Sequence, residues 1–168
     1  MPTKFEHSAR FSASVATVYT AFSSAEYWQR RVADVGGPIA RIDEFAVRDD
    51  GVHVALMQGV AEEFLPSIVT KVRPGDLEID RTEHWRPAGP DGSASGTFTA
   101  AIPGVPATIG GTLGLSPDGA GSRLSIRGDV EIKVPLIGGK IEKAAIDQLV
   151  RLLESEDEFT SRWTTTPQ

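Results

Sequence analysis

Residues 123–153 read RLSIRGDVEIKVPLIGGKIEKAAIDQLVRLL, and the spacing of their apolar residues changes at Pro135. Before Pro135 apolar and polar residues alternate, which is typical of a strand with one buried face. After Pro135 the apolar residues recur at helical spacing, which predicts one helix over about residues 137–163. At about 1.5 Å per residue this helix is about 40 Å long, enough to cover one apolar face of an antiparallel sheet. The apolar stripe of the predicted helix consists of Ile141, Ala145, Leu149, Leu152, Phe159 and Trp163.

Upstream of this stretch the chain begins with a strand pattern and two short helix patterns. Residues 5–11 alternate between apolar and polar side chains, as a half-buried strand does. Ser14 is a good N-cap for a helix that extends to Phe22. A second short helix contains Trp28 and ends near Gly36, where glycine favours termination.

Residues 39–134 are predicted to be nearly all strand, residues 67–72 included. Short turns rich in glycine, proline and aspartate separate the strands, which indicates antiparallel pairing rather than helical crossovers. We therefore expect one α+β domain over residues 1–168. It should hold a curved antiparallel sheet of about seven strands, two short helices after the first strand, and a long C-terminal helix packed across the sheet. Residues 164–168 are expected to form a frayed tail.

The composition excludes several classes of function. The chain has 168 residues, is 40% hydrophobic and carries a net charge of −6, which describes one soluble globular domain. No apolar run reaches the roughly 18–20 residues that a membrane-spanning helix needs, and Glu6 lies where a signal peptide would be apolar. We expect a cytoplasmic protein without integral membrane association. A pI near 5.1 argues against a nucleic-acid partner, and the absence of cysteine excludes disulfides and thiolate chemistry.

The order of the predicted elements resembles that of a known superfamily, and several short motifs support the resemblance. The motifs are Phe11-Ser12-Ala13-Ser14-Val15, Glu83-His84-Trp85, Gly96-Thr97-Phe98, the segment from Val134 to Glu142, and the segment from Glu158 to Trp163. The chain resembles the START-like helix-grip proteins of the SRPBCC superfamily, and most closely an actinobacterial family known as domain of unknown function 2505. The resemblance implies a deep pocket between the sheet and the long helix. In relatives such pockets often take lipids, sterols, polyketides or hormones, and some relatives are cyclases or aromatases. The resemblance transfers no catalytic residue.

Two apparent catalytic motifs do not meet the requirements of their chemistry. Gly138-Gly139-Lys140 opens a helix, but Ile141 stands where a phosphate-binding loop needs serine or threonine. Residues 92–96 are similar to a nucleophile elbow, but Ala94 occupies the position of the nucleophile. We therefore expect neither nucleotide binding nor serine hydrolysis.

Charged residues on predicted buried faces are the sharpest anomaly. Arg81 and Glu83 share one face of a strand with Leu77, Ile79 and Trp85. Arg41 and Asp43 repeat the pattern between Ile39 and Phe45 in a second strand. An isolated buried charge is very costly, so each pair is either a structural ion pair at the rim of the sheet or a polar group facing a wet cavity.

Histidines are the other candidates for acid–base chemistry or metal binding. His7 shares a face with Phe5 and Phe11, so it is either a core residue or a group that hydrogen-bonds a ligand. His7, His53 and His84 lie on separate predicted strands without flanking carboxylate clusters. We therefore expect no metal site and no cofactor.

The preferred function is binding or carriage of a hydrophobic small molecule such as a lipid, a polyketide-like or an isoprenoid-like compound, without catalysis. The cavity should have roughly 300–1,000 Å³, with His7, Arg41, Asp43, Arg81 and Glu83 as candidate polar groups. An enzyme of the cyclase, aromatase or dehydratase kind that uses the same cavity is the first alternative, and a protein-interaction module is the second. The sequence identifies no catalytic residue and no oligomeric state. The candidate apolar lining consists of Phe5, Trp28, Phe64, Trp85, Leu149 and Leu152.

Overall fold

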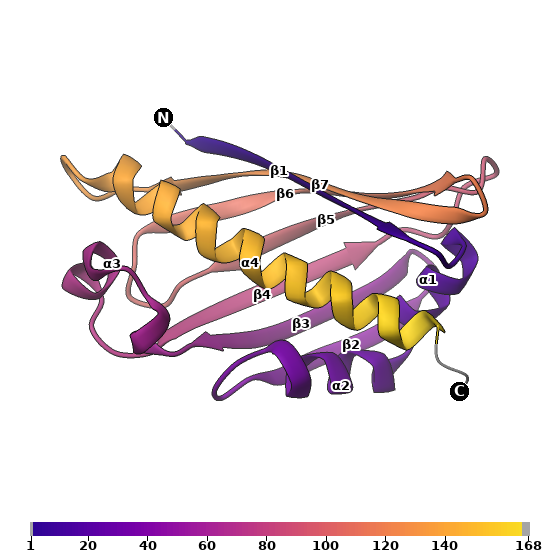
Figure 1. Cartoon of the computed structure of the whole chain (residues 1–168), viewed down its shortest axis with the longest axis horizontal. Helices are drawn as coiled ribbons and strands as arrows, with labels where there is room; N and C mark the ends of the chain where they lie inside the picture. The colour runs from indigo at the N-terminus through magenta and orange to yellow at the C-terminus, as the bar shows by residue number, and fades with distance from the viewer. Residues whose placement is uncertain (1, 166–168) are drawn as a thin grey trace.

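A computed structural model describes residues 2–165, and in it one seven-stranded sheet curves around a long helix (Figure 1). The strands are β1 (Thr3–Phe11), β2 (Arg41–Arg48), β3 (Gly51–Val60), β4 (Leu77–Trp85), β5 (Ala94–Ala101), β6 (Ala107–Asp118) and β7 (Gly121–Ile132). The helices are α1 (Val15–Phe22), α2 (Ala25–Val35), α3 (Ser67–Val72) and α4 (Gly138–Thr165), with a 3₁₀ turn, η1, at Glu62–Phe64.

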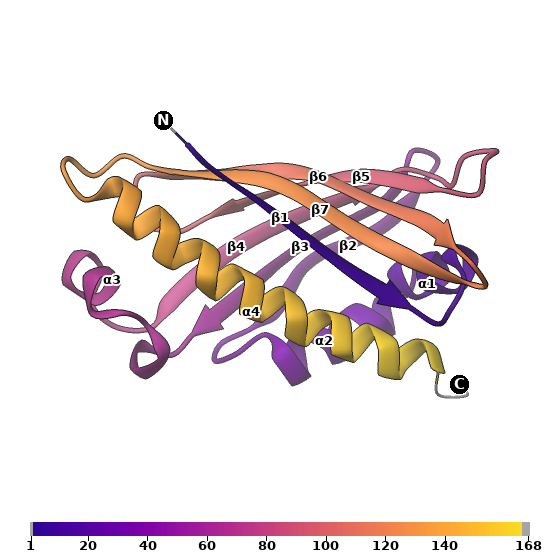
Figure 2. The same cartoon turned by 45° about the horizontal axis from the view of Figure 1, so that its top comes forward.

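All strand pairings are antiparallel, in the order β1-β7-β6-β5-β4-β3-β2. The first strand therefore lies at one edge beside the last strand, and β2 lies at the other edge. The helices α1 and α2 carry the chain from the first edge to the second (Figure 2). Ser14 and Ser24 cap them by accepting hydrogen bonds from the amides of Thr17 and Tyr27. The sequence prediction of a seven-stranded antiparallel sheet with a long C-terminal helix is confirmed.

Helix α4 crosses the concave face of the sheet and is attached to it at the helix's N-terminal end. The buried carboxylate of Glu142 accepts hydrogen bonds from the hydroxyl of Thr3 at 2.6 Å and from the amide of Ile132 at 2.7 Å. One side chain of α4 thus joins β1 and β7, the two strands nearest to it along that edge. This contact fixes where the helix begins relative to the sheet.

The interior between α4 and the sheet is filled differently at its two ends. The packed end, beside α1, α2 and residues 154–163 of α4, is filled by aromatic side chains. Phe22 lies 5.1 Å from Trp85 between ring centroids, and Tyr27 lies 5.5 Å from Phe159. The hollow end, beside α3 and residues 141–153 of α4, is lined mainly by aliphatic side chains.

Two expectations about secondary structure are wrong. Residues 67–72 form helix α3 rather than a strand, because Ile68, Val69 and Val72 have helical spacing and Pro66 supplies a favourable start. Their β-branched composition favoured the prediction of a strand. Six residues are too few for the helical period to outweigh that preference. Thr164 and Thr165 belong to α4 rather than to a frayed tail, and residues 166–168 lie outside the described residues.

Candidate functional site

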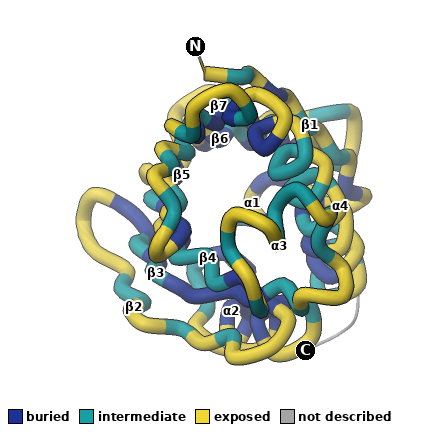
Figure 3. The backbone as a smooth tube through the Cα atoms, turned by 90° about the vertical axis from the view of Figure 1, so that its left-hand side faces the viewer, coloured by how far each residue is buried: buried dark blue, intermediate teal, exposed yellow. Residues whose placement is uncertain are grey.

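The candidate site is the cavity at the hollow end. The sheet and α4 encircle this end of the molecule, and α3 lies across it (Figure 3). Only four residues of the cavity wall are polar: Gln58, Arg73, Arg81 and Gln148. The apolar wall residues come from all strands except β2, from α3 and α4, and from the loops beside α3 and β6; they include Phe5, Val69, Phe98, Ile109, Ile126, Leu149 and Leu152.

The cavity is smaller than the sequence analysis expected. Its volume is about 90 Å³, whereas pockets for drug-sized ligands have roughly 300–1,000 Å³. Its apolar lining surrounds unfilled space, since Leu149 and Leu152 lie in its wall and are only half-buried despite their inward position. A larger ligand therefore requires part of the wall to move.

A cluster of buried charges closes the inner end of the cavity. We call Arg31, Gln58, Arg81, Glu83 and Glu156 the charge cluster; all five are at most 6% exposed. Glu156 of α4 is its centre. Its two carboxylate oxygens lie 3.0 and 2.9 Å from Nη1 of Arg81, and its Oε2 accepts a hydrogen bond from Nε2 of Gln58 at 2.8 Å. Arg31 of α2 pairs with Oε1 of Glu156 from the opposite side.

Electrostatics in the charge cluster favour the ionised carboxylate. Burial alone would raise the pKa of Glu156, but the positive charges of Arg31 and Arg81 outweigh burial and lower that pKa to about 2. The two arginines are formally balanced by Glu156 and Glu83, whose Oε1 lies 3.4 Å from Nη2 of Arg81. Arg81 is therefore already neutralised by groups of the protein itself.

The charge cluster leaves one acceptor in the cavity wall without a partner. The amide nitrogen of Gln58 donates to Glu156, which fixes the orientation of the amide, because the reverse orientation would place two acceptors together. Among the described residues, the amide oxygen of Gln58 has no hydrogen-bond partner, and neither has Oε2 of Glu83. A buried acceptor without a partner has a free-energy cost that a ligand donor or a water would relieve.

The sequence-predicted site residues divide into three groups by position. Phe5, Arg81, Leu149 and Leu152 lie in the cavity wall. Glu83 and Trp85 lie behind it, around a smaller space beside the charge cluster. Five residues are elsewhere: His7, Trp28, Phe64, Arg41 and Asp43.

Four of these placements, all except that of His7, differ from the expected position in the cavity. Trp28 is completely buried in the packed end, where its indole N–H donates to the carbonyl of Phe22. Phe64 is 66% exposed, and its neighbour Leu65 takes the place in the wall. Arg41 and Asp43 are exposed and form an ion pair with each other at 2.7 Å.

A register shift explains the wrong prediction for Arg41 and Asp43. The pairing of β2 with β3 is irregular between Ile42 and Glu44, so Asp43 is an extra residue in the strand. Ile42 and Phe45 both pack against the core, which strict alternation does not allow. The inward face of β2 therefore changes from even to odd numbering within the strand.

His7 lies close to a carboxylate but outside the cavity wall. Its Nε2 is 2.6 Å from Oδ2 of Asp157 in α4, and both side chains are largely buried. Burial raises the pKa of Asp157, and the contact with His7 opposes that rise. Neither residue is part of the cavity lining.

Sequence reasoning missed Glu156, Arg31 and Gln58, although each stands at a spacing that continues a series of buried residues in its element. Glu156 lies on the apolar stripe of α4, because it follows Leu152 by four residues and precedes Phe159 by three. Arg31 follows Tyr27 by four residues in α2, and Gln58 follows the inward series of β3. The signal that could have found them is a polar residue at a position where its element is otherwise apolar, although this signal does not identify their partners.

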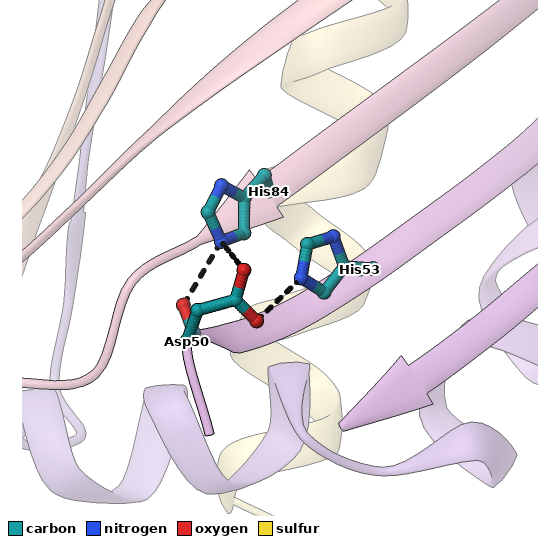
Figure 4. Close-up of side chains that lie close together, drawn as sticks. All are labelled: Asp50, His53 and His84. Carbon is teal, nitrogen blue, oxygen red and sulfur yellow. Dashed lines mark hydrogen bonds and ion pairs between the residues drawn. The ribbon is translucent and has the colours of Figure 1, made fainter. Parts of the chain in front are cut away.

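The pairing of β3 with β4 also brings together two of the histidines that lie on separate strands. His53 and His84 are opposite each other in the register, and Asp50 lies beside both (Figure 4).

Within residues 2–165, no helix is both long and apolar enough to span a membrane.

Comparisons with known proteins agree with this architecture. Residues 6–164 match the family described as protein of unknown function DUF2505. An uncharacterized protein of Mycobacterium tuberculosis is 35% identical over 172 residues, which cover 98% of each chain. The crystal structure of the ZhuI aromatase/cyclase from Streptomyces has a TM-score of 0.60 at 11% identity, covering 98% of this chain and 94% of that one. A START superfamily protein from Mycobacterium smegmatis has a TM-score of 0.53 at 14% identity, covering 95% and 98%.

Proposed function

We propose that this chain, which belongs to the DUF2505 family of proteins of unknown function, binds and carries a hydrophobic small molecule in the cavity between its sheet and α4. The observation that carries the proposal is the composition of the cavity wall, which is apolar except for Gln58, Arg73, Arg81 and Gln148. Burial of apolar ligand surface contributes roughly 25 cal/mol per Å², which provides affinity without any reaction.

The ligand enters at the end covered by α3. This helix is six residues long, none of its residues is buried, and no side chain caps its N-terminus. An element with so little burial opens at low free-energy cost. Because the cavity of about 90 Å³ is too small for a lipid-sized molecule, we propose that α3 moves outward when such a ligand binds.

The part of the ligand that reaches the inner end is uncharged. A ligand carboxylate there would meet Arg81, but Glu156 and Glu83 already neutralise this arginine. The anion would therefore be buried without a free counter-charge, which is strongly unfavourable. A hydroxyl group fits better, since it can donate to the unpartnered amide oxygen of Gln58. Lipid-like, polyketide-like and isoprenoid-like alcohols meet this requirement.

An enzyme of the cyclase, aromatase or dehydratase kind is the second candidate. The observation that favours it is the contact of 2.6 Å between His7 and Asp157, a pair that could transfer protons. The pair is outside the cavity wall, and only Asp157 reaches the smaller space beside the charge cluster. A carrier is therefore preferred, because an acid–base group must lie within hydrogen-bonding distance of its substrate.

Two experiments test the proposal. Native mass spectrometry of freshly purified protein, followed by organic extraction, identifies any bound molecule, which is then incubated with the protein. A carrier returns the molecule unchanged. Conversion by the wild type and not by the variant His7→Phe would establish the enzyme instead.

The second experiment compares decan-1-ol with decanoate, which have the same chain length and differ in charge. We expect the alcohol to bind more tightly than decanoate when each displaces the fluorescent probe N-phenyl-1-naphthylamine from the protein. The variant Gln58→Leu should weaken binding of the alcohol about 2–10-fold, as loss of one hydrogen bond does. Gln148→Leu is the matched control, because Gln148 lies in the same wall and already donates to the carbonyl of Phe64. Tighter binding of decanoate would contradict an uncharged ligand.

A further inference from the structure

A second group of chemically active side chains lies on the face of the sheet opposite the cavity. Arg81, Glu83 and Trp85 of β4 point inward and are buried, so His84, between the last two, lies on the outer face. The register places His53 of β3 directly opposite His84. Asp50 precedes β3 in the tight turn from β2 and lies beside both rings (Figure 4).

The polar atoms of these three residues converge. Nε2 of His53 is 2.8 Å from Oδ1 of Asp50, and Nε2 of His84 is 3.8 Å from Oδ2 of the same carboxylate. The imidazole rings stack with centroids 4.2 Å apart and an interplanar angle of 13°. One possible ligand atom from each residue lies within 4.8 Å of the others.

The backbone positions of the three residues are tightly defined. His53 and His84 are held by strand pairing, and the turn is held by Gly51, which has a φ of 118°. A Cβ on Gly51 would lie 1.8 Å from the carbonyl oxygen of Trp85, so the turn packs directly against the end of β4. Asp50 is therefore fixed beside His84 by the fold and not by the side-chain contact alone.

We propose that Asp50, His53 and His84 bind a late divalent transition-metal ion, with Zn²⁺ as the representative ion. Two imidazoles and one carboxylate suit zinc, nickel or copper, whereas magnesium and calcium prefer a shell of oxygen ligands. Three protein ligands with a fourth, solvent-reachable position is a common arrangement for zinc. Tetrahedral bonds of about 2.0–2.1 Å require ligand atoms about 3.3 Å apart, so rotation of these partly exposed side chains brings the donors into position.

Besides side-chain rotation, metal binding requires a change of tautomer at His53, whose Nε2 donates to the Asp50 carboxylate, and likewise at His84. Nε2 of His84 also lies 2.9 Å from the backbone carbonyl oxygen of Asp50, a contact in which the ring nitrogen carries the proton. When Nε2 binds the ion, that proton is on Nδ1 and the imidazole stays neutral. The bound ion links the β2–β3 turn to β4 and stabilises the folded chain by mass action. The site is on the other face of the sheet from the cavity, so its existence does not depend on the proposed carrier function.

Isothermal titration of untagged protein with ZnCl₂, paired with the melting temperature in the same buffer, tests the proposal. We expect one Zn²⁺ per chain and a rise in melting temperature, with no rise on addition of MgCl₂. The single variants His53→Gln, His84→Gln and Asp50→Asn should each weaken Zn²⁺ binding by at least about tenfold. Asp49→Asn is the matched control, since it removes the same charge from the neighbouring exposed residue and should leave binding unchanged.

Three results would overturn the proposal: no saturable Zn²⁺ binding, equal affinity for Mg²⁺, or unchanged Zn²⁺ affinity in both histidine variants. Circular dichroism of each variant without metal establishes that it is folded. Because the three substitutions are made in separate variants, a folding defect in one of them leaves the other two to test Zn²⁺ binding.

Discussion

The two ends of the interior are built from one helix and one sheet, yet they have opposite properties. At the packed end α4 presents Glu156, Phe159 and Thr160, all buried. At the hollow end the same helix presents Leu149 and Leu152, which line a cavity and are only half-buried. The difference indicates that stability is concentrated at one end, which leaves the other free to open for a ligand.

The charge cluster marks the boundary between the ends and should show the largest effect. Glu156→Gln leaves Arg31 and Arg81 buried without their shared carboxylate, and we expect a loss of about 3–5 kcal/mol in the free energy of unfolding. Urea unfolding at neutral pH measures it. Glu154→Gln, an exposed change in the same helix, should unfold like the wild type. A loss below about 1 kcal/mol for Glu156→Gln would mean that the charge cluster does not stabilise the packed end.

Matched leucine truncations compare the two ends directly. Leu115→Ala removes a side chain of β6 that is 1% exposed and lies outside the cavity wall, and it should cost about 2–5 kcal/mol in the free energy of unfolding. Leu149→Ala should cost less, below about 2 kcal/mol, because its side chain already faces empty space. Equal losses in urea unfolding would show that the hollow end is as well packed as the other.

Acid should selectively weaken the packed end. The pKa of Glu156 is about 2 in the folded chain against an ordinary value of 4.5. The ionised carboxylate therefore stabilises the fold fully above about pH 4.5, and this contribution, roughly 3 kcal/mol, is lost as the pH falls toward 2. Urea midpoints measured at pH 5, 4 and 3 should fall more steeply for the wild type than for Glu156→Gln. Parallel curves would contradict the assignment of the lowered pKa to this residue.

The smallest effect is expected at the edge strand, away from both ends. Arg41→Met and Asp43→Asn break an exposed ion pair that solvent screens. We expect no measurable change in the urea midpoint or in ligand affinity. A clear loss of ligand affinity in either variant would show that these residues contribute to the binding site.

Much of the fold follows from the sequence because it depends on periodicity over long segments. The change of period at Pro135 correctly predicted a strand followed by a long helix, and the turns between residues 39 and 134 correctly predicted antiparallel pairing. Helix α3 was missed because six residues hold less than two helical turns.

The candidate site was predicted only in part, for reasons that are geometric. Alternation correctly placed Arg81 and Glu83 on a buried face, but Glu156, which pairs with Arg81, is 75 residues from it in sequence. The register shift at Asp43 interrupts the alternation that had placed Arg41 and Asp43 inward. Cavity volume depends on how side chains fill space, which no spacing of residues indicates.

Filling the hollow end tests the central claim most directly. Ala145→Phe adds a ring to the cavity wall, and Asp147→Phe adds the same ring to the exposed side of α4. The measurement is a fluorescence titration with the uncharged apolar probe N-phenyl-1-naphthylamine, supported by melting temperatures of each protein. We expect the wild type and Asp147→Phe to bind one probe molecule with similar affinity, and Ala145→Phe to bind at least tenfold more weakly while remaining folded. Equal binding by all three proteins, or no binding by the wild type, would contradict a ligand cavity at this end of the molecule.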